Sequence, residues 1–326
     1  MPKDHDKEKM SLLVTGAPRS GTTVLGRSMA FSSDINYLWE PFNLRFRRGI
    51  PDYYPYVGPS SPQEKRNIYY KFAEDTVRLR NLHAFIEIRP DDPLLNKIGK
   101  SFGINRNMVH YRQAQLRQFF HRPAVLLCKD PIAVFFSRYL LTEHQFRVIA
   151  VVRHPAAIML SRRQLGWHFN YSNWRDQTDL YVDHFQTIDT EMSKYDPSDY
   201  TVECGFHWLA CYTFLATLHQ EFPDRVCFVR HEDYCIEPNE TMQKIFKFSG
   251  VNMNDTVLSN VESITSGDNI EKESRRLATL SSRDAVRLAD KWKSAISETE
   301  LTKLDEITGR VARVLYPEEN YWTIDQ

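Results

Sequence analysis

The sequence lacks the features that mark several classes of protein. Its 326 residues contain no run of about 18 apolar residues, so we expect no membrane span. Only five cysteines occur, at wide spacings and without a Cys-x-x-Cys pair, which argues against a disulfide framework or a structural zinc site. Residues 1–10 lack the apolar stretch of a secretory signal. We therefore expect a cytoplasmic protein with a flexible N-terminal tail over residues 1–10.

The sequence also lacks an excess of charge of either sign. The 42 Lys and Arg residues balance the 42 Asp and Glu residues, whereas proteins that bind nucleic acid through phosphate contacts are usually basic. We therefore expect no nucleic acid polymer as a partner. The apolar content of 42% and the charged content of 26% are typical of a folded protein. The length fits a single domain over residues 11–326.

One segment departs from this balance. Residues 93–129 contain no Asp or Glu. Two interpretations stay open: a basic helix face that is solvated, or a basic wall that attracts an anionic donor or acceptor. The cations of the segment are Lys97, Lys100, Arg106, Arg112, Arg117, Arg122 and Lys129.

Short, continuous apolar runs predict the fold class. Such runs occur at residues 12–14, 124–128, 146–152 and 226–229, and unbroken apolar sequence is typical of strands buried on both faces of a parallel sheet. The alternation of these runs with helical segments predicts an α/β fold with a doubly wound, mainly parallel sheet flanked by helices. The predicted helices cover residues 130–141, 156–164, 205–221, 238–250 and 297–315.

A glycine-rich turn follows the first predicted strand. Residues 16–23 read Gly-Ala-Pro-Arg-Ser-Gly-Thr-Thr and precede a helical stretch. Such a turn points backbone N–H groups and the positive end of a helix dipole at one place, where an anion binds. The spacing matches the Gly-x-x-x-x-Gly of a Walker A loop, but Thr22 stands where that motif has Lys. The cation lies inside the loop instead, at Arg19.

The carboxylate that a metal-dependent nucleotide-binding enzyme needs is also missing. Such an enzyme holds Mg²⁺ with an Asp at the end of a hydrophobic strand. The strand at 146–152 ends instead in Arg153, and a cation at the carboxyl edge of a sheet points to an anion. Ser161 lies about two helical turns further on, near the face that Arg153 reaches. These two residues predict a second phosphate site, and we expect no metal.

The two motifs resemble those of the sulfotransferases that use 3′-phosphoadenosine 5′-phosphosulfate (PAPS). Residues 18–23 match the loop of that family for the 5′-phosphosulfate, and residues 153–161 match its 3′-phosphate motif. Weaker similarity covers residues 230–238 and 248–251 and the region of Trp292, although His231 stands where many members have Tyr. The motif style is closest to the tyrosylprotein and carbohydrate sulfotransferases.

The resemblance implies a P-loop-like sulfotransferase fold. It also implies PAPS as the co-substrate and 3′-phosphoadenosine 5′-phosphate (PAP) as the product, without a metal. The donor site implied by the two motifs consists of Arg19, Ser20, Gly21, Thr22, Thr23, Arg153 and Ser161.

Glu40 is the candidate general base for transfer to an acceptor hydroxyl. It follows the first strand–helix unit, where a second strand is expected to end at the same edge of the sheet as the phosphate loop. Trp39 and Phe42 are expected to shield it from water. The resemblance agrees, because tyrosylprotein and carbohydrate sulfotransferases have a glutamate base at a similar distance after this loop. The alternative is a surface Glu in the turn before Pro41.

Lys129 and Arg19 are the candidate catalytic cations. Lys129 follows a buried run, and its Lys-Asp-Pro context resembles that of tyrosylprotein sulfotransferases, in which the Lys is regarded as a transition-state stabiliser. The alternative is a Lys at a helix start that pairs with Asp130. Arg19 is expected to contact the transferring group and the bridging oxygen. Ser281 or Ser282 is a further candidate to approach the sulfate.

Aromatic residues gather in two stretches of the sequence. Packing in the core and the loops is the favoured interpretation, but sugars and phenols stack on such rings, so an acceptor pocket is a second one. The residues are Tyr37, Trp39, Phe42, Tyr53, Tyr54, Tyr56, Trp167, Phe169, Tyr171 and Trp174.

The leading hypothesis is a sulfotransferase that moves a sulfuryl group from PAPS to a hydroxyl or amine of a small-molecule or carbohydrate acceptor. The alternatives are a P-loop kinase that acts on a nucleotide or small molecule, and a non-catalytic nucleotide-binding protein. The sequence leaves the oligomeric state open between a monomer and a homodimer.

Overall fold

Five parallel strands form the centre of the protein. The structure is a computed structural model, and it describes residues 10–84, 97, 101, 106–265 and 289–324. The strands are β1 (Ser11–Thr15), β2 (Ile35–Trp39), β3 (Val125–Lys129), β4 (Phe146–Val152) and β5 (Val226–Arg230). Their spatial order is β2-β3-β1-β4-β5, and every neighbouring pair is parallel. The predicted doubly wound parallel sheet is confirmed, and β2 is the second strand that Glu40 was expected to follow.

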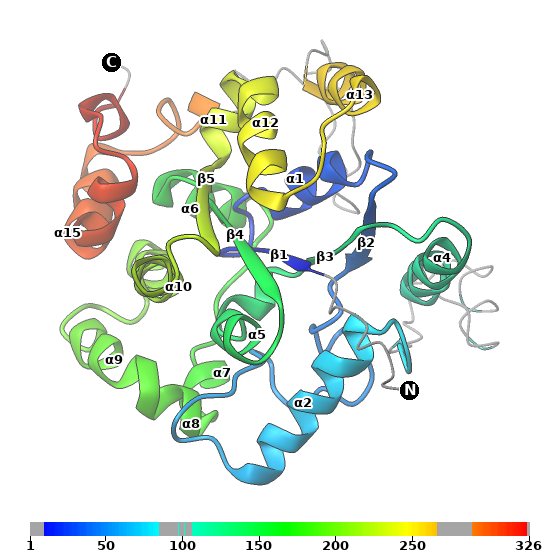
Figure 1. Cartoon of the computed structure of the whole chain (residues 1–326). Helices are drawn as coiled ribbons and strands as arrows, with labels where there is room; N and C mark the ends of the chain where they lie inside the picture. Colours follow the sequence, from blue (N-terminus) through cyan, green and yellow to red (C-terminus); the bar gives the residue numbers. More distant parts are fainter. Residues whose placement is uncertain (1–9, 85–96, 98–100, 102–105, 266–288, 325–326) are drawn as a thin grey trace.

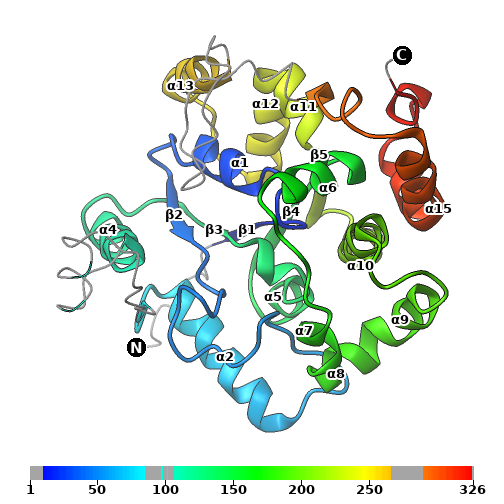
Figure 2. The same ribbon diagram turned by 180° about the vertical axis from the view of Figure 1, so that it is seen from behind.

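Helices connect the strands and cover both faces of the sheet (Figures 1 and 2). Short helices of other types are η1 (Pro131–Val134, 3-10), η2 (Tyr181–Phe185, π) and η3 (Glu319–Tyr321, 3-10). The α-helices are α1 (Thr22–Met29), α2 (Gln63–Val77), α4 (Arg106–Phe120), α5 (Ser137–Glu143), α6 (Pro155–Gln164), α7 (Ser172–Arg175), α8 (Thr178–Leu180), α9 (Gln186–Met192), α10 (Tyr200–Glu221), α11 (His231–Ile236), α12 (Pro238–Ser249), α13 (Asp255–Thr265) and α15 (Glu298–Leu315).

Local capping explains where several helices begin and end. Ser297 and Glu300 form the predicted capping box at the start of α15, and Gly250 ends α12 in the left-handed conformation with φ 64°. The predicted helix over residues 130–141 is wrong as a continuous element. The Asp130 side chain accepts a hydrogen bond from Ile132 N (3.1 Å) and starts the separate helix η1.

The predicted start of α10 at Gly205 is also wrong. The Asp199 side chain accepts a hydrogen bond from Thr201 N (2.7 Å), so the helix begins five residues earlier, at Tyr200. Gly205 therefore lies inside α10. A Cβ at this position would lie 3.2 Å from Ile307, so the missing side chain allows α10 and α15 to pack closely.

Alternate residues of the strands point into two separate cores. Leu12 and Val14 of β1 pack with helices α1, α12 and α13, whereas Leu13 packs on the other face with α5, α6 and α10. Both cores are apolar, as the continuous apolar runs predict. All five cysteines are free thiols, as their spacing indicates.

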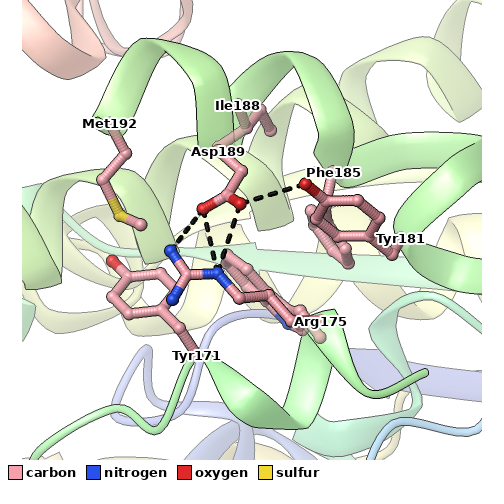
Figure 3. A pocket seen from close by; sticks show the side chains of 8 residues that line it. Tyr171, Arg175, Tyr181, Phe185, Ile188, Asp189 and Met192 are labelled. Carbon is pink, nitrogen blue, oxygen red and sulfur yellow. Dashed lines mark hydrogen bonds and ion pairs between the residues drawn. The ribbon is translucent and has the colours of Figure 1, made fainter. Parts of the chain in front are cut away.

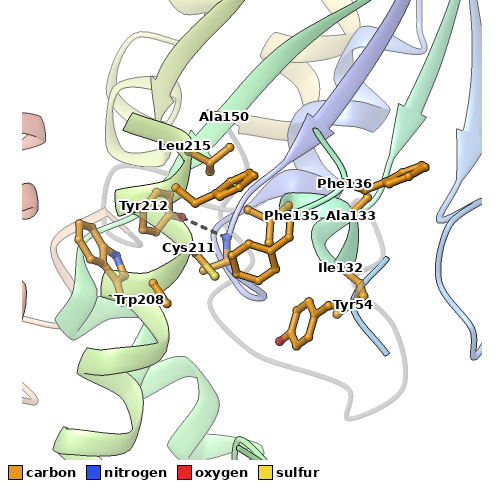
Figure 4. Packing of buried hydrophobic residues seen from close by; sticks show 14 of the residues in the cluster. Tyr54, Ile132, Ala133, Phe135, Phe136, Ala150, Trp208, Cys211, Tyr212 and Leu215 are labelled. Atoms are coloured by element: carbon orange, nitrogen blue, oxygen red, sulfur yellow. Dashed lines mark hydrogen bonds between the residues drawn. The ribbon is translucent and has the colours of Figure 1, made fainter. Parts of the chain in front are cut away.

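The core on the α10 face also fixes the phosphate loop (Figure 4). Tyr212 of α10 is fully buried, and its hydroxyl donates a hydrogen bond to Val151 O (2.9 Å). The same hydroxyl accepts a hydrogen bond from Ala17 N (3.3 Å). One buried side chain thus joins the end of β4 to the loop that follows β1.

We predict that Tyr212→Phe lowers the free energy of unfolding by about 1–3 kcal/mol, because two buried backbone groups lose their partner. Urea unfolding followed by circular dichroism measures the loss. Tyr195→Phe is the matched control, since no hydrogen bond of the Tyr195 hydroxyl is found among the described residues. An equal loss in both variants would contradict the role of the Tyr212 hydroxyl.

Candidate active site

The carboxyl edge of the sheet gathers ionisable residues that follow or end each of the five strands. Because all five strands are parallel, the segments that follow them meet at one edge. The loop after β1 contains Arg19, Glu40 follows β2, and Lys129 ends β3. Arg153 follows β4 and His231 follows β5. The candidate residues, separated by up to about two hundred positions in the sequence, therefore lie along one edge.

The phosphate loop depends on two glycines. Gly16 has φ 150°, and a Cβ there would collide with the carbonyl oxygen of Val151. Gly21 has φ 99°, and a Cβ there would collide with the His231 ring. Helix α1 begins at the next residue, Thr22, so its first N–H groups point into the loop. Ser20 and Thr22 are buried and Thr23 is half-buried. This geometry fits the anion cradle that the sequence predicts, with tight packing of Val151 and His231 against the loop.

Arg19 lies at the centre of a cluster with Arg153 and Ser161. Its backbone has φ 79°, which is uncommon for a residue with a side chain. Its Nε donates a hydrogen bond to Ser161 Oγ (3.0 Å), and its guanidinium lies 5.7 Å from the centre of the Trp167 ring. Arg153 Nη1 donates a long hydrogen bond of 3.4 Å to Arg19 O. The structure therefore brings Arg19, Arg153 and Ser161 together, with Arg19 between the other two.

Arg153 has spare capacity for an anion. Trp208 Nε1 donates a hydrogen bond to the Arg153 carbonyl oxygen (2.9 Å) and holds its backbone. Among the described residues, no hydrogen-bond partner exists for the buried Nε of Arg153. A buried guanidinium N–H without a partner is costly and fits a bound phosphate. Burial and the cations Arg153 and Arg19 lower the pKa of His231 to about 3, so this ring is neutral beside them.

Glu40 and Lys129 form an ion pair at the other end of the site. Trp39 and Lys129 are partners in the register of β2 and β3, so Glu40 follows directly opposite the Lys129 side chain. The Lys129 ammonium contacts Glu40 Oε1, and Asn43 Nδ2 donates to Glu40 Oε2 (2.9 Å). Lys129 is fully buried, and its Nζ lies 3.9 Å from the centre of the Trp39 ring. Glu40 is therefore a buried, oriented carboxylate and not a surface residue.

Hydrogen bonds to Lys129 and Asp130 hold the backbone around Glu40. Glu40 has φ 45°, and its N–H donates a hydrogen bond to Lys129 O (2.8 Å). Asp130 is fully buried and accepts a hydrogen bond from Phe42 N (2.8 Å) in addition to its bond with Ile132 N. Burial and the nearby Glu40 carboxylate raise the pKa of Asp130 to about 8. Asp130 therefore anchors the turn, while the ion pair of Lys129 is with Glu40.

Residues 9–315 match the sulfotransferase domain family, which is most of the chain. The chain belongs to the sulfotransferase family. Enzymes of this family use PAPS as the sulfuryl donor, so the chain is a PAPS-dependent sulfotransferase. The branch within the family is not assigned by the match and stays a prediction.

Solved structures with a similar fold include other sulfotransferases. The sulfotransferase domain from the curacin biosynthetic pathway has 16% identity and a TM-score of 0.50, and the match covers 94% of this chain and 97% of that one. The sulfotransferase domain of the Synechococcus PCC 7002 olefin synthase has 19% identity and a TM-score of 0.45, with 94% of each chain covered. Mouse SULT7A1 complexed with PAP has 15% identity and a TM-score of 0.41, with 95% and 88% covered. No curated protein matches the sequence.

Most aromatic residues of the sulfotransferase that were candidates for acceptor contacts pack against each other. Trp174 is buried and stacks on Phe185 with 4.0 Å between ring centres. The pocket beside Trp174 has a volume of only about 10 Å3, and an ion pair between Arg175 and Asp189 crosses it (Figure 3). It has room for about one water molecule. Trp167 differs, because it is 48% exposed and lies beside Arg19.

Sequence reasoning missed several residues of the site. Asn43, which orients Glu40, belongs to no motif, and Tyr212 lies in the middle of a helix outside every motif. His231 was noticed as a departure from the family pattern but not as the neighbour of Gly21. Ser281 and Ser282 lie outside the described residues. Within the described part of the chain, no group of three or more His, Cys, Asp or Glu is placed to hold a metal ion.

The neutral His231 predicts a dependence of stability on pH. In the unfolded chain a histidine gains a proton near pH 6.5, whereas the folded His231 does so only near pH 3, so acid favours unfolding across this window. In His231→Gln, the slope of the unfolding free energy against pH between these values should fall by about 1.4 kcal/mol per pH unit. Urea unfolding at a series of pH values measures the slope. A slope equal to that of the wild type would show that His231 is protonated in the fold.

Proposed function

We propose that this sulfotransferase moves a sulfuryl group from PAPS to a hydroxyl or amine of a small-molecule or carbohydrate acceptor, with Glu40 as the general base. The observation that carries the proposal is the buried contact between Glu40 and Lys129 at the sheet edge that also holds the phosphate loop. A base at one end of a site and a phosphate cradle at the other is the arrangement that in-line group transfer needs.

The residues of the donor side suit the two phosphate groups of PAPS. The donor supplies the sulfuryl group and a good leaving group. The loop over residues 16–23 and the first turn of α1 would hold the 5′-phosphosulfate through backbone N–H groups, with Ser20, Gly21, Thr22 and Thr23 lining the cradle. Arg153, with its free buried N–H, and Ser161 would hold the 3′-phosphate. Among the described residues no metal ligand set accompanies these contacts. We propose metal-independent binding.

Glu40 would remove the proton from the acceptor. As the acceptor oxygen forms its bond to sulfur, its proton passes to the Glu40 carboxylate, and the electron pair of the broken S–O bond stays on the departing 5′-phosphate. Asn43 and Lys129 hold both carboxylate oxygens in place, so the base needs no rearrangement before the transfer.

Two cations would stabilise the charge that develops during transfer. Arg19 belongs to the phosphate loop and is held by Ser161, so its guanidinium would neutralise the negative charge that grows on the bridging oxygen. Lys129 lies on the acceptor side beside Glu40. Proton transfer to Glu40 weakens its attraction for Lys129, which frees the ammonium to interact with the transferring group. Lys129 thus has both a positioning and a stabilising role.

The acceptor would approach between Glu40 and Trp167. Trp167 is half-exposed next to Arg19, so a sugar or phenol ring stacked on it would lie next to the transferring group. No helix among the described residues combines the length and apolar composition that crossing a membrane requires. The cytoplasmic location, the similarity to the tyrosylprotein and carbohydrate branch, and the single domain over residues 11–326 stay predictions.

We predict that Glu40→Gln lowers the turnover number by about 10²–10⁴-fold, because the amide keeps the size of the carboxylate but accepts no proton. Transfer of labelled sulfate from PAPS across a panel of hydroxyl and amine acceptors measures turnover, and calorimetry measures PAP binding, which should be unchanged. The control is Glu64→Gln, an exposed residue of α2. Full turnover in Glu40→Gln would remove Glu40 from the mechanism.

We predict that Arg153→Gln weakens PAP binding by about tenfold or more, because a charged hydrogen bond to the 3′-phosphate is lost. Adenosine 5′-phosphate, which lacks that phosphate, should bind the variant and the wild type equally. Calorimetry without added metal measures both ligands. Arg138→Gln, which breaks a surface ion pair with Glu221, is the control. Equal weakening for both ligands would mean that Arg153 supports the fold rather than the 3′-phosphate.

A further inference from the structure

Helix α4 exposes apolar side chains on the face opposite the core. Tyr111 and Ala114, three residues apart, are buried and face β2. Val109, Leu116 and Phe120 follow each other at spacings of seven and four residues and therefore share the opposite face of the helix. Leu116 is 57% and Phe120 is 70% exposed, and the neighbouring Phe119 is 75% exposed. We call Val109, Leu116, Phe119 and Phe120 the apolar stripe.

Cations accompany the apolar stripe. By helical geometry, Arg112 lies within the stripe between Phe119 and Leu116, and Arg117 lies beside Phe120, where its guanidinium also donates a hydrogen bond to Ser32 O (2.9 Å). Arg122 follows the end of the helix and is exposed. No Asp or Glu occurs anywhere between residues 93 and 129. The exposed face of α4 therefore combines large apolar side chains with charge of only one sign.

We propose that α4 binds in the plane of an anionic lipid membrane. In such a helix the apolar side chains enter the boundary between headgroups and acyl chains, and the flanking cations contact anionic headgroups. The positive charge around the stripe favours an anionic bilayer over other partners. A second copy of this chain would bring the same cations to the contact and be repelled, whereas an anionic bilayer attracts all of them.

The surroundings of α4 fit this occupant. A hollow of about 430 Å3 beside the stripe is lined by apolar side chains, neutral polar side chains and the Arg117 guanidinium, which suits an acyl chain next to its headgroup. Its lining residues are Ser33, Gln113, Leu116, Arg117, Phe120 and His121. Figures 1 and 2 show α4 at the margin of the protein beside β2.

The bound helix would lie next to the catalytic pair. His110 of α4 stacks on Trp39 with 6.3 Å between ring centres, and the Trp39 ring covers the Lys129 ammonium. Binding of α4 to a membrane would therefore hold the Glu40 end of the site close to the lipid surface. The binding itself needs no turnover, so it can be tested independently of the proposed function.

Co-sedimentation of the full chain with lipid vesicles tests the proposal. One set of vesicles contains phosphatidylcholine alone, and a second also contains phosphatidylserine. We expect binding to the second set only, with an affinity that falls as the salt concentration rises. Arg112→Gln should weaken binding by about fivefold, equivalent to ~1 kcal/mol. Phe120→Ser should weaken it by about tenfold or more.

The control is Val314→Ser, an exposed apolar residue of α15 at the opposite margin of the protein. It should bind vesicles as the wild type does, and circular dichroism melting shows whether each variant folds. Absence of binding to both vesicle types, or unchanged binding by folded Phe120→Ser, would overturn the proposal. So would a dimer of the wild type that Phe120→Ser converts to a monomer, because a second copy would then cover the stripe.

Discussion

The parallel direction of the five strands is the constraint on which the rest of the structure depends. Parallel strands place all their carboxyl ends at one edge, and the order β2-β3-β1-β4-β5 sets the phosphate loop in the middle of that edge. Arg153 then lies on the β4 side of the loop, and Glu40 and Lys129 lie on the β3 side. A chain with no net charge thereby has a strongly charged site. The pairing of strands that are distant in the sequence brings together charged residues that are widely spaced along the chain.

Bringing these charged residues together strains the backbone at two of them, and buried contacts offset the strain. Arg19 and Glu40 both have positive φ, a conformation that costs about 1–3 kcal/mol for residues with a side chain and that persists where the surroundings determine it. Tyr212 fixes the loop of Arg19, and Asp130 fixes the turn of Glu40. The buried Lys129 ammonium would be highly unfavourable without a counter-charge, and Glu40 supplies that charge.

Much of the fold could be predicted because it follows from short stretches of the sequence. Continuous apolar runs predict buried parallel strands, and the segments that follow these runs contain residues of the site. The contact between Lys129 and Glu40 could not be predicted in this way, because it depends on β2 and β3 being neighbours although 89 residues separate the two side chains. The tyrosine under the phosphate loop was missed for the same reason. The sequence shows the cations around α4, but it does not show which apolar side chains of the helix are exposed. Their exposure becomes clear only when the structure shows which side of α4 packs against β2.

A double-mutant cycle on the ion pair tests the central claim most directly. The single-turnover rate of sulfuryl transfer is measured for the wild type, Glu40→Gln, Lys129→Met and the double variant. If Glu40 and Lys129 act as one unit, the double variant loses about as much rate as the more damaged single variant. Losses that multiply independently would contradict a catalytic pair and leave only two separate residues at one edge of the sheet.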